Sequence, residues 1–212
     1  MWKSVLRLFL ISLVVAAPSC APRQITTPAI EARSPEAVRS ELSSVRSINA
    51  VFSIAIKDDH TVTEGEAAMQ LTRSGDLSLR VYSMGFPVFD LESEDGEITS
   101  SRSMSDEHKL SLARGLRQGF FWWDIDGPLR MEEGCYTLTG EGRRLWIDLQ
   151  TGLPTRQLIA TETNLLMLSY DSPARNEDGI WYPSKIAMDL PPYRVTLQIE
   201  KITYIRDPLS GH

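Results

Sequence analysis

Apolar and polar residues alternate with a period of two along most of the chain after residue 50, which is typical of β-strands with one buried face. Short turns rich in Gly, Asp and Pro separate the alternating segments, so the pattern predicts an antiparallel meander of about ten strands. The expected strands span 50–56, 62–73, 77–81, 88–93, 97–103, 135–139, 143–149, 155–161, 165–170, 181–190 and 193–205. Polar residues such as Ser78, Arg80 and Arg143 are expected on the solvated face of this sheet.

Two breaks in the alternation predict irregular structure in the second half of the chain. Residues 171–179 show no strand pattern and are expected to form a long loop before the strand that begins at Trp181. In the last strand the apolar phase changes after Ile199. One extra residue near Lys201 accounts for the change and predicts a β-bulge that bends the strand.

A helical pattern precedes the first strand. Ser34 is a favourable N-cap, and Pro35 suits the first helical position because its missing N–H needs no partner there. Val38 and Leu42 then begin an apolar stripe with a spacing of four residues. The pattern predicts a helix from Pro35 to about Arg46.

A second helical segment interrupts the strands between about Asp106 and Phe121. Leu112, Leu116 and Phe120 recur every four residues and mark the face that is expected to be buried. The order of helix, strands, helix and strands predicts an α+β fold. We expect a long curved antiparallel sheet that carries both helices on one face.

The first twenty residues form an export signal. Lys3 and Arg7 supply a positive start, and an apolar run of about ten residues follows up to Ala17. The run ends in Cys20 and resembles a bacterial lipoprotein signal, in which the cysteine thiol takes a diacylglyceryl group and becomes the new N-terminus. Pro18 departs from the usual lipobox, where a small residue or Thr is more typical. The alternative is an ordinary secretory signal that is cut near Ala17 or Ser19, with Cys20 incidental.

The segment after the cysteine carries no apolar period and is rich in Pro, Thr and Ala. Such a composition is typical of a flexible tether between an anchor and a domain. In enterobacterial lipoproteins an Asp after the cysteine directs retention in the inner membrane, so by resemblance Ala21 favours the outer membrane. The chain is therefore expected to divide into a signal segment (1–19), a tether (20–34), one domain (35–206) and a tail (207–212).

Composition excludes several function classes. The full chain has a net charge of −6, and removal of Lys3 and Arg7 with the signal brings it to −8. A surface of this charge does not suit nucleic acid, whose phosphates need a basic partner. With Cys20 acylated, Cys135 is left alone, so no disulfide forms within the chain, and we expect Cys135 to pack in a strand as a small apolar residue. No other apolar segment approaches the 18 residues that a membrane-spanning helix needs.

Catalytic and metal-binding signatures are missing from the sequence. His60 and His108 have neither metal-ligand spacing nor a paired cysteine, and both are expected on the solvated surface. No Gly-x-Ser-x-Gly elbow, glycine-rich phosphate loop or triad order is present. We therefore expect no catalytic site, metal or cofactor, and an envelope hydrolase is the least favoured of the functions considered.

One known family shares this arrangement of elements. An N-terminal helix that leads directly into Ile48–Ile54, a strand–turn–strand segment Leu79–Gly96, an internal helix and a final strand at 193–205 together resemble the lipoprotein-localisation factors LolA and LolB. The resemblance covers about residues 35–206 and rests on pattern more than on invariant residues. It implies an incomplete β-barrel with the helices as a lid over a hydrophobic cavity. The signal ending in Cys20 favours LolB, a lipoprotein of the outer membrane, over the soluble LolA.

The resemblance implies a binding function. The cavity of this family receives the acyl chains of other lipoproteins, and LolB passes these lipoproteins into the outer membrane, with a soluble LolA-like carrier as a possible partner. The residues expected to line such a cavity are Phe52, Ile54, Leu79, Val81, Phe89, Leu112, Leu116, Phe120, Leu166, Leu168, Ile186 and Met188. The alternative is a filled core built from the same residues, in which case the protein is a structural or assembly subunit of the envelope.

Several further residues have two readings. Met84 and Phe86 are expected in a loop that contacts the membrane during delivery, or else folded under the sheet. Trp122 and Trp123 either line the cavity mouth or dock the end of the helix into the core. Members of the LolA group use an arginine to bond the closed lid. Arg73 and Arg80 lie on suitable early strands, and neither is matched to that role by the sequence.

We expect the substitution Cys20→Ser to remove the acylation site and to leave the precursor uncleaved or the protein soluble. Two acyl chains hold a protein firmly at a membrane, because each buried CH₂ contributes about 0.8 kcal/mol. Metabolic labelling with a tagged fatty acid checks this expectation. A wild-type protein that takes up no label would show that Cys20 is not acylated.

Overall fold

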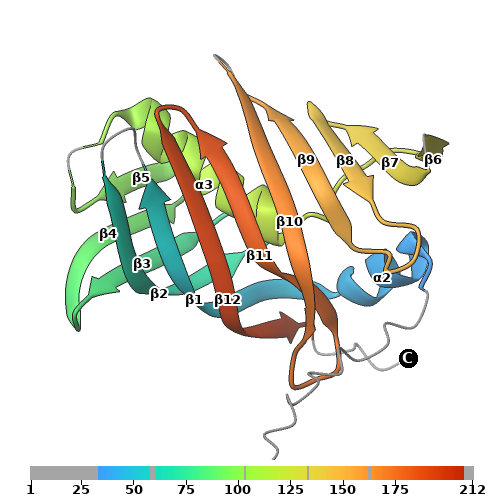
Figure 1. The fold of residues 1–212 in the computed structure, drawn as a ribbon, viewed down its shortest axis with the longest axis horizontal. Helices are drawn as coiled ribbons and strands as arrows, with labels where there is room; N and C mark the ends of the chain where they lie inside the picture. The colour runs from blue at the N-terminus through green and yellow to red at the C-terminus, as the bar shows by residue number, and fades with distance from the viewer. Residues whose placement is uncertain (1–32, 58–60, 103, 133, 162–163, 208–212) are drawn as a thin grey trace, which may run out of the picture. The chain divides into compact units, whose positions relative to one another are not determined.

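The computed structural model describes residues 33–57, 61–102, 104–132, 134–161 and 164–207 (Figure 1). The signal segment, Cys20, most of the predicted tether, the turn at 58–60 with His60, and the tail from residue 208 lie outside the described residues. Every described helix and strand belongs to one compact unit, Glu31–His212. This unit has its own hydrophobic core, which is the property that lets a domain fold by itself.

The described residues form two helices and twelve strands. The helices are α2 (Pro35–Leu42) and α3 (Asp106–Phe120). The strands are β1 (Val45–Lys57), β2 (Val62–Thr72), β3 (Leu77–Ser83), β4 (Phe86–Glu94), β5 (Glu97–Ser100), β6 (Leu129–Glu132), β7 (Cys135–Gly140), β8 (Arg143–Ile147), β9 (Pro154–Ala160), β10 (Leu165–Arg175), β11 (Trp181–Leu190) and β12 (Tyr193–Arg206).

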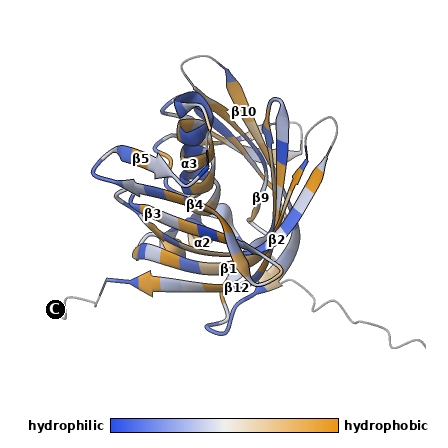
Figure 2. Ribbon diagram, turned by 90° about the vertical axis from the view of Figure 1, so that its left-hand side faces the viewer, coloured by the Kyte–Doolittle hydropathy of each residue, from blue (hydrophilic) through white to orange (hydrophobic). Residues whose placement is uncertain are grey.

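All twelve strands belong to one antiparallel sheet in the order β5-β4-β3-β2-β1-β12-β11-β10-β9-β8-β7-β6. Among the described residues the edge strands β5 and β6 do not pair with each other, so the sheet is curved and open. Figure 2 shows α3 inside the curve, between β5 and β10. The predicted α+β fold, an incomplete barrel with an internal helix as lid, is confirmed. We call this arrangement the half-barrel.

Helix α2 is shorter than the sequence predicted. Its start is as expected, because the Ser34 side chain accepts a hydrogen bond of 3.2 Å from the backbone N–H of Ala37. The helix ends at Leu42, and Val45 is already the first residue of β1, where it is buried and faces Arg206. Val45 fits the apolar spacing of the predicted helix and also that of β1. It belongs to β1, where its side chain is buried.

Two strand predictions were incomplete. Residues 171–175 were expected in a long loop, but β10 continues through them and pairs with β11 as far as Arg175 and Trp181. Residues on both faces of this end of β10 are exposed, so the sequence shows no alternation of apolar and polar residues there. Strand β6 was missed altogether, since it has four residues, lies at the sheet edge and buries none of them fully.

The predicted bulge in the last strand is confirmed. Val51 faces Lys201 and Phe52 faces Ile199, so Glu200 is the extra residue. The bulge restores the inward direction of the apolar side chains on both sides of it, because a slip of one residue moves every side chain to the other face. Cys135, at the start of β7, is half-buried, and its Sγ donates to the carbonyl oxygen of Glu132 at 3.3 Å.

Helix α3 approaches the sheet closely in its middle. A side chain on Gly115 would place its Cβ 3.0 Å from both Leu166 Cδ2 and Met188 Sδ. A Cβ on Gly119 would lie 2.8 Å from Leu168 Cδ2. Glycine costs a helix roughly 1 kcal/mol relative to alanine, so its use at these two positions is explained by the close contact with β10 and β11.

We expect Leu168→Asp to lower the free energy of unfolding by about 3–5 kcal/mol, because it forces a carboxylate into an apolar interior. Leu168 is 0% exposed, whereas Leu165 on the same strand is 66% exposed. The matched control Leu165→Asp should change stability by about 0.5 kcal/mol or less. Urea unfolding of both variants tests the assignment of faces, and equal losses would contradict it.

Candidate functional site

The twelve residues expected to line a cavity all lie buried between the sheet and α3. Strands β1, β3, β4, β10 and β11 supply nine of them by alternation, and the fourth-residue spacing within α3 supplies Leu112, Leu116 and Phe120. The Phe52 and Phe120 rings lie 6.2 Å apart, which shows that sheet and helix contact each other directly in the middle of the half-barrel.

The open space lies at one end of the half-barrel, where α3 begins. A cavity of about 330 Å³ is found there. We call it the mouth cavity and define it by its lining residues, which are Ile56, Thr61, Thr63, Val81, Val88, Phe89, Arg102, Met104, His108, Leu112, Leu190, Tyr193 and Val195. Three of the twelve expected residues, Val81, Phe89 and Leu112, line this cavity. The other nine fill the core.

Paired strands build the cavity wall. Val81 faces Phe89 across β3 and β4, and Ile56 faces Val195 across β1 and β12. Directly opposed side chains in an antiparallel pair lie on the same face, so each pair adds apolar surface to the same side. Leu112 closes the cavity from the first half of α3.

His108 was expected on the solvated surface; it is partly exposed and also contacts neighbouring residues. Its Nδ1 lies 2.7 Å from Ser105 Oγ and its Nε2 lies 3.3 Å from the carbonyl oxygen of Pro191. Its ring also meets the Tyr193 ring edge-on, with centroids 5.7 Å apart. His108 therefore joins the first turn of α3 to the turn between β11 and β12.

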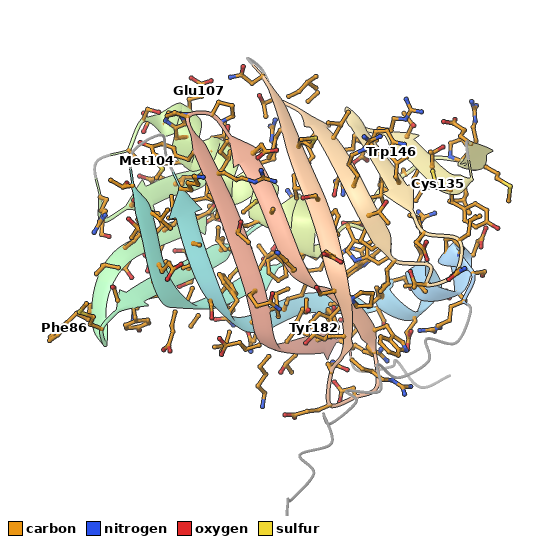
Figure 3. The ribbon with its side chains drawn as sticks, in the orientation of Figure 1. Phe86, Met104, Glu107, Cys135, Trp146 and Tyr182 are labelled. Atoms are coloured by element: carbon orange, nitrogen blue, oxygen red, sulfur yellow. The ribbon has the colours of Figure 1, made fainter. Side chains whose placement is uncertain are left out.

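The sequence reasoning missed most of the rim. Ile56 and Val195 continue the alternation of their strands, so the same alternation predicts that they face inward. Arg102 was expected in a strand over 97–103, but β5 ends at Ser100, and no sequence pattern pointed to Met104. Figure 3 shows Met104 and Glu107 at the same end of the molecule, where α3 starts.

The other end of α3 is held by Arg143. Sequence alternation placed this residue on the solvated face, but it is 5% exposed. Its Nη1 donates to the carbonyl oxygen of Asp124 at 2.5 Å, and Nη2 donates to those of Gln118 at 3.3 Å and Trp122 at 3.4 Å. The last carbonyls of a helix have no partner within the helix, so Arg143 satisfies one such carbonyl of α3, that of Gln118, and two carbonyls of the segment that follows the helix.

Two polar side chains complete the surroundings of Arg143. The Tyr170 hydroxyl lies 2.5 Å from the Gln157 side-chain amide. With the amide turned so that its oxygen faces the arginine, that oxygen accepts from Arg143 Nε and Nη2 at 2.8 Å each. Burial lowers the pKa of Arg143 and raises the pKa of Tyr170, because both charged forms are poorly solvated there.

Two more arginines bind the segment that follows α3. Arg39 donates to the carbonyl oxygen of Ile125 at 2.7 Å. Arg73 forms an ion pair with Asp124 at 2.6 Å, and its hydrogen bond to this carboxylate raises the pKa of Arg73. Arg39, Arg73 and Arg143 together form what we call the arginine cluster. Arg80 pairs with Asp90 on the neighbouring strand and is not part of it.

Trp122 and Trp123 dock the end of α3 into the core. Both are buried, their rings meet edge-on at 5.7 Å, and Trp123 also meets Tyr204 at 6.0 Å. Neither residue lines the mouth cavity.

Met84 and Phe86 lie at the tip of the β3–β4 hairpin, where Met84 is 96% and Phe86 is 72% exposed. Figure 3 shows Phe86 projecting outward from this tip. The alternative in which both fold under the sheet is therefore wrong.

No protein-family model and no curated protein matches the sequence. Two solved structures resemble it over most of their length. A DUF1329 family protein from Desulfovibrio piger has a TM-score of 0.53 and 11% identity, with 84% of this chain and 92% of that chain covered. A LolA superfamily protein from Nitrosomonas europaea has a TM-score of 0.53 and 12% identity, with 83% of this chain and 95% of that chain covered. The protein has a LolA-like fold.

The likeness at these identities extends to the fold alone. Within the LolA-like fold of this chain, the described helices include none with the length and apolar character to cross a membrane. The described residues also contain no group of three or more His, Cys, Asp or Glu side chains arranged to hold a metal ion. Among the described residues, the mouth cavity offers an apolar site beside an exposed hairpin, and a more polar cavity of about 540 Å³ lies along Ala113, Arg114 and Arg117 of α3.

We expect Arg143→Met to lower the free energy of unfolding by about 2–4 kcal/mol, because it leaves buried carbonyl groups without donors. Amide hydrogen exchange of residues 118–125 should accelerate, since these residues lose their attachment to β8. The control Arg144→Met removes an exposed ion pair with Glu132 and should cost about 1 kcal/mol or less. Unchanged exchange in the Arg143 variant would show that the helix end is held by packing instead.

Proposed function

We propose that this is a lipid-anchored protein of the bacterial envelope that binds acyl chains at the mouth of its half-barrel and inserts lipoproteins into the outer membrane. It acts as a binding protein and not as an enzyme. The observation that carries the proposal is the continuity between the apolar mouth cavity and the exposed apolar tip of the β3–β4 hairpin. The fold likeness to the LolA superfamily agrees with it.

The hairpin connects the two features within a few residues. Val81, Val88 and Phe89 line the mouth cavity, and Met84 and Phe86 stand at the tip between them. Apolar area removed from water contributes about 25 cal/mol per Å². A chain that leaves the cavity along this hairpin therefore exchanges one apolar contact for another before it meets the membrane.

The backbone at the tip supports a role outside folding. Met84 has φ 51° and Gly85 has φ 80°, the left-handed pair that a two-residue hairpin turn requires. Gly, Asn and Asp are the residues that suit such positions, and a side chain with a Cβ is strained there. An almost fully exposed methionine at this position adds nothing to the core, which favours a contact with something beyond the protein.

The proposed anchor is compatible with this contact. Arg33 lies thirteen positions after Cys20, and its guanidinium pairs with Glu41 of α2 at 2.8 Å. A fully extended chain of that length spans at most about 45 Å. Acylation of Cys20 would thus keep the start of the half-barrel within about 45 Å of the membrane surface.

A second candidate function is a structural or assembly subunit with a filled core. The contacts of Gly115 and Gly119 with β10 and β11 favour it, because they leave no space between α3 and the middle of the sheet. Displacement of an apolar dye from residues 31–212 by acyl chains separates the two functions. Binding of the dye in the cavity, or a lipid that co-purifies with the protein, supports the first function. If neither the dye nor a co-purifying lipid is bound, the second is supported.

We expect Phe86→Glu to leave melting temperature and acyl-chain binding unchanged and to reduce the transfer of a labelled lipoprotein to liposomes. A charge then replaces an apolar side chain at the step where the protein touches hydrocarbon. The matched control is Met131→Glu on β6, a residue that is also exposed (66%) and lies on the far edge of the sheet. Normal transfer by the Phe86 variant would remove the hairpin tip from the mechanism.

A further inference from the structure

The rim of the mouth cavity is cationic, although the protein as a whole is acidic with a net charge of −6. Its lining contains Arg102 and His108 and no Asp or Glu. None of the ion pairs between described residues uses the Arg102 guanidinium. His108 is already engaged with Ser105 and Pro191. Arg102 is therefore the cation that a ligand at this rim would meet.

The size of the cavity limits the ligand. A group of the size of a water molecule or a methylene occupies roughly 30 Å³ in a liquid. The volume of about 330 Å³ thus holds about eleven such groups. Toward β10 and β11 the space is closed, because Leu166, Leu168 and Met188 lie against the glycines of α3. There is room for one chain of medium length and not for two or three.

We infer that the mouth cavity takes a single acyl chain of about ten to twelve carbons with an anionic head group, and that Arg102 binds this head group. The inference rests on the proposed binding of acyl chains and names a ligand class beside lipoproteins, whose acylated cysteine has no carboxylate or phosphate head group. The chain lies between Phe89, Leu112 and Val195, and the carboxylate or phosphate stays at the solvated rim. An ion pair in such a position is worth up to about 1 kcal/mol, which is about fivefold in affinity.

The first experiment uses residues 31–212, after a cooperative melting transition has established that this unit folds. Decanoate, decyl phosphate, decanol and decyltrimethylammonium compete with an apolar dye below their micelle concentrations. Both anions should bind about fivefold more tightly than decanol, and the cation most weakly. The ratio of decanoate to decyl phosphate tells a carboxylate site from a phosphate site.

The outcomes separate the inference from the proposed function. Equal affinity for the anions and decanol overturns the inference and leaves acyl-chain binding intact. No binding of any of the four overturns both.

The second experiment tests Arg102 directly. Arg102→Gln should weaken decanoate binding about fivefold and leave decanol binding and the melting temperature unchanged. Arg130→Gln, an exposed arginine on β6 that does not line the cavity, is the matched control and should change neither affinity. Val88→Phe, which fills the cavity from its wall, should weaken all four ligands. Unchanged decanoate affinity in the Arg102 variant overturns the assignment of the head-group site.

The third experiment measures chain length with fatty acids of eight to sixteen carbons. Each additional CH₂ should raise affinity about fourfold, at about 0.8 kcal/mol each, up to about twelve carbons. Longer chains should then gain nothing, and a diacyl phosphatidate should bind no more tightly than its single-chain counterpart. A rise that continues to sixteen carbons would show that α3 moves aside for a larger ligand, which overturns the single-chain limit.

Discussion

The buried guanidinium of Arg143 fixes the position of the helix on which the rest of the half-barrel depends. A sheet whose edge strands do not meet leaves its apolar face uncovered, and α3 is the element that covers it. The carbonyl groups at the end of this helix need donors, because no following turn supplies them. Arg143 reaches one of them, that of Gln118, from β8, and it also reaches the carbonyls of Trp122 and Asp124 just after the helix. Arg39 reaches the carbonyl of Ile125 beyond them. A buried carbonyl without a donor costs about 1–3 kcal/mol. These arginines therefore stabilise the end of the helix in this position.

The two ends of α3 are held with unequal strength. At its C-terminal end it is bound by the arginine cluster and by two buried tryptophans. In its middle, Gly115 and Gly119 bring it into direct contact with β10 and β11. At its start the contacts are polar and near the surface, between His108 and Pro191 and between Glu107 and Asn164, each at 3.3 Å. The mouth cavity lies at this end of the helix, next to these polar contacts.

Sequence patterns predicted the strands and helices because burial on one face leaves a period that can be read directly. They failed where the residue types in the sequence do not reflect which side chains are buried. The end of β10 near Arg175 and the whole of β6 bury too little to show alternation. Arg143 was placed on the wrong face because its type suggests solvent, whereas its partners are carbonyls distant in the sequence. The cavity was beyond reach, because an open site and a filled core use the same apolar residues, and small shifts of α3 decide between them.

The location of the mouth cavity next to the β3–β4 hairpin has an energetic reason under the proposed function. A chain of about ten to twelve carbons carries about 8–10 kcal/mol of transfer free energy, at about 0.8 kcal/mol for each CH₂. From a cavity deep in the sheet, the chain would have to cross water on its way to the membrane. Most of this transfer free energy would then oppose its release. Alternation along one hairpin avoids this, because Val81 and Phe89 face inward while the tip carries Met84 and Phe86 outward. The same short segment then forms both the wall that holds a chain and the surface that meets the membrane.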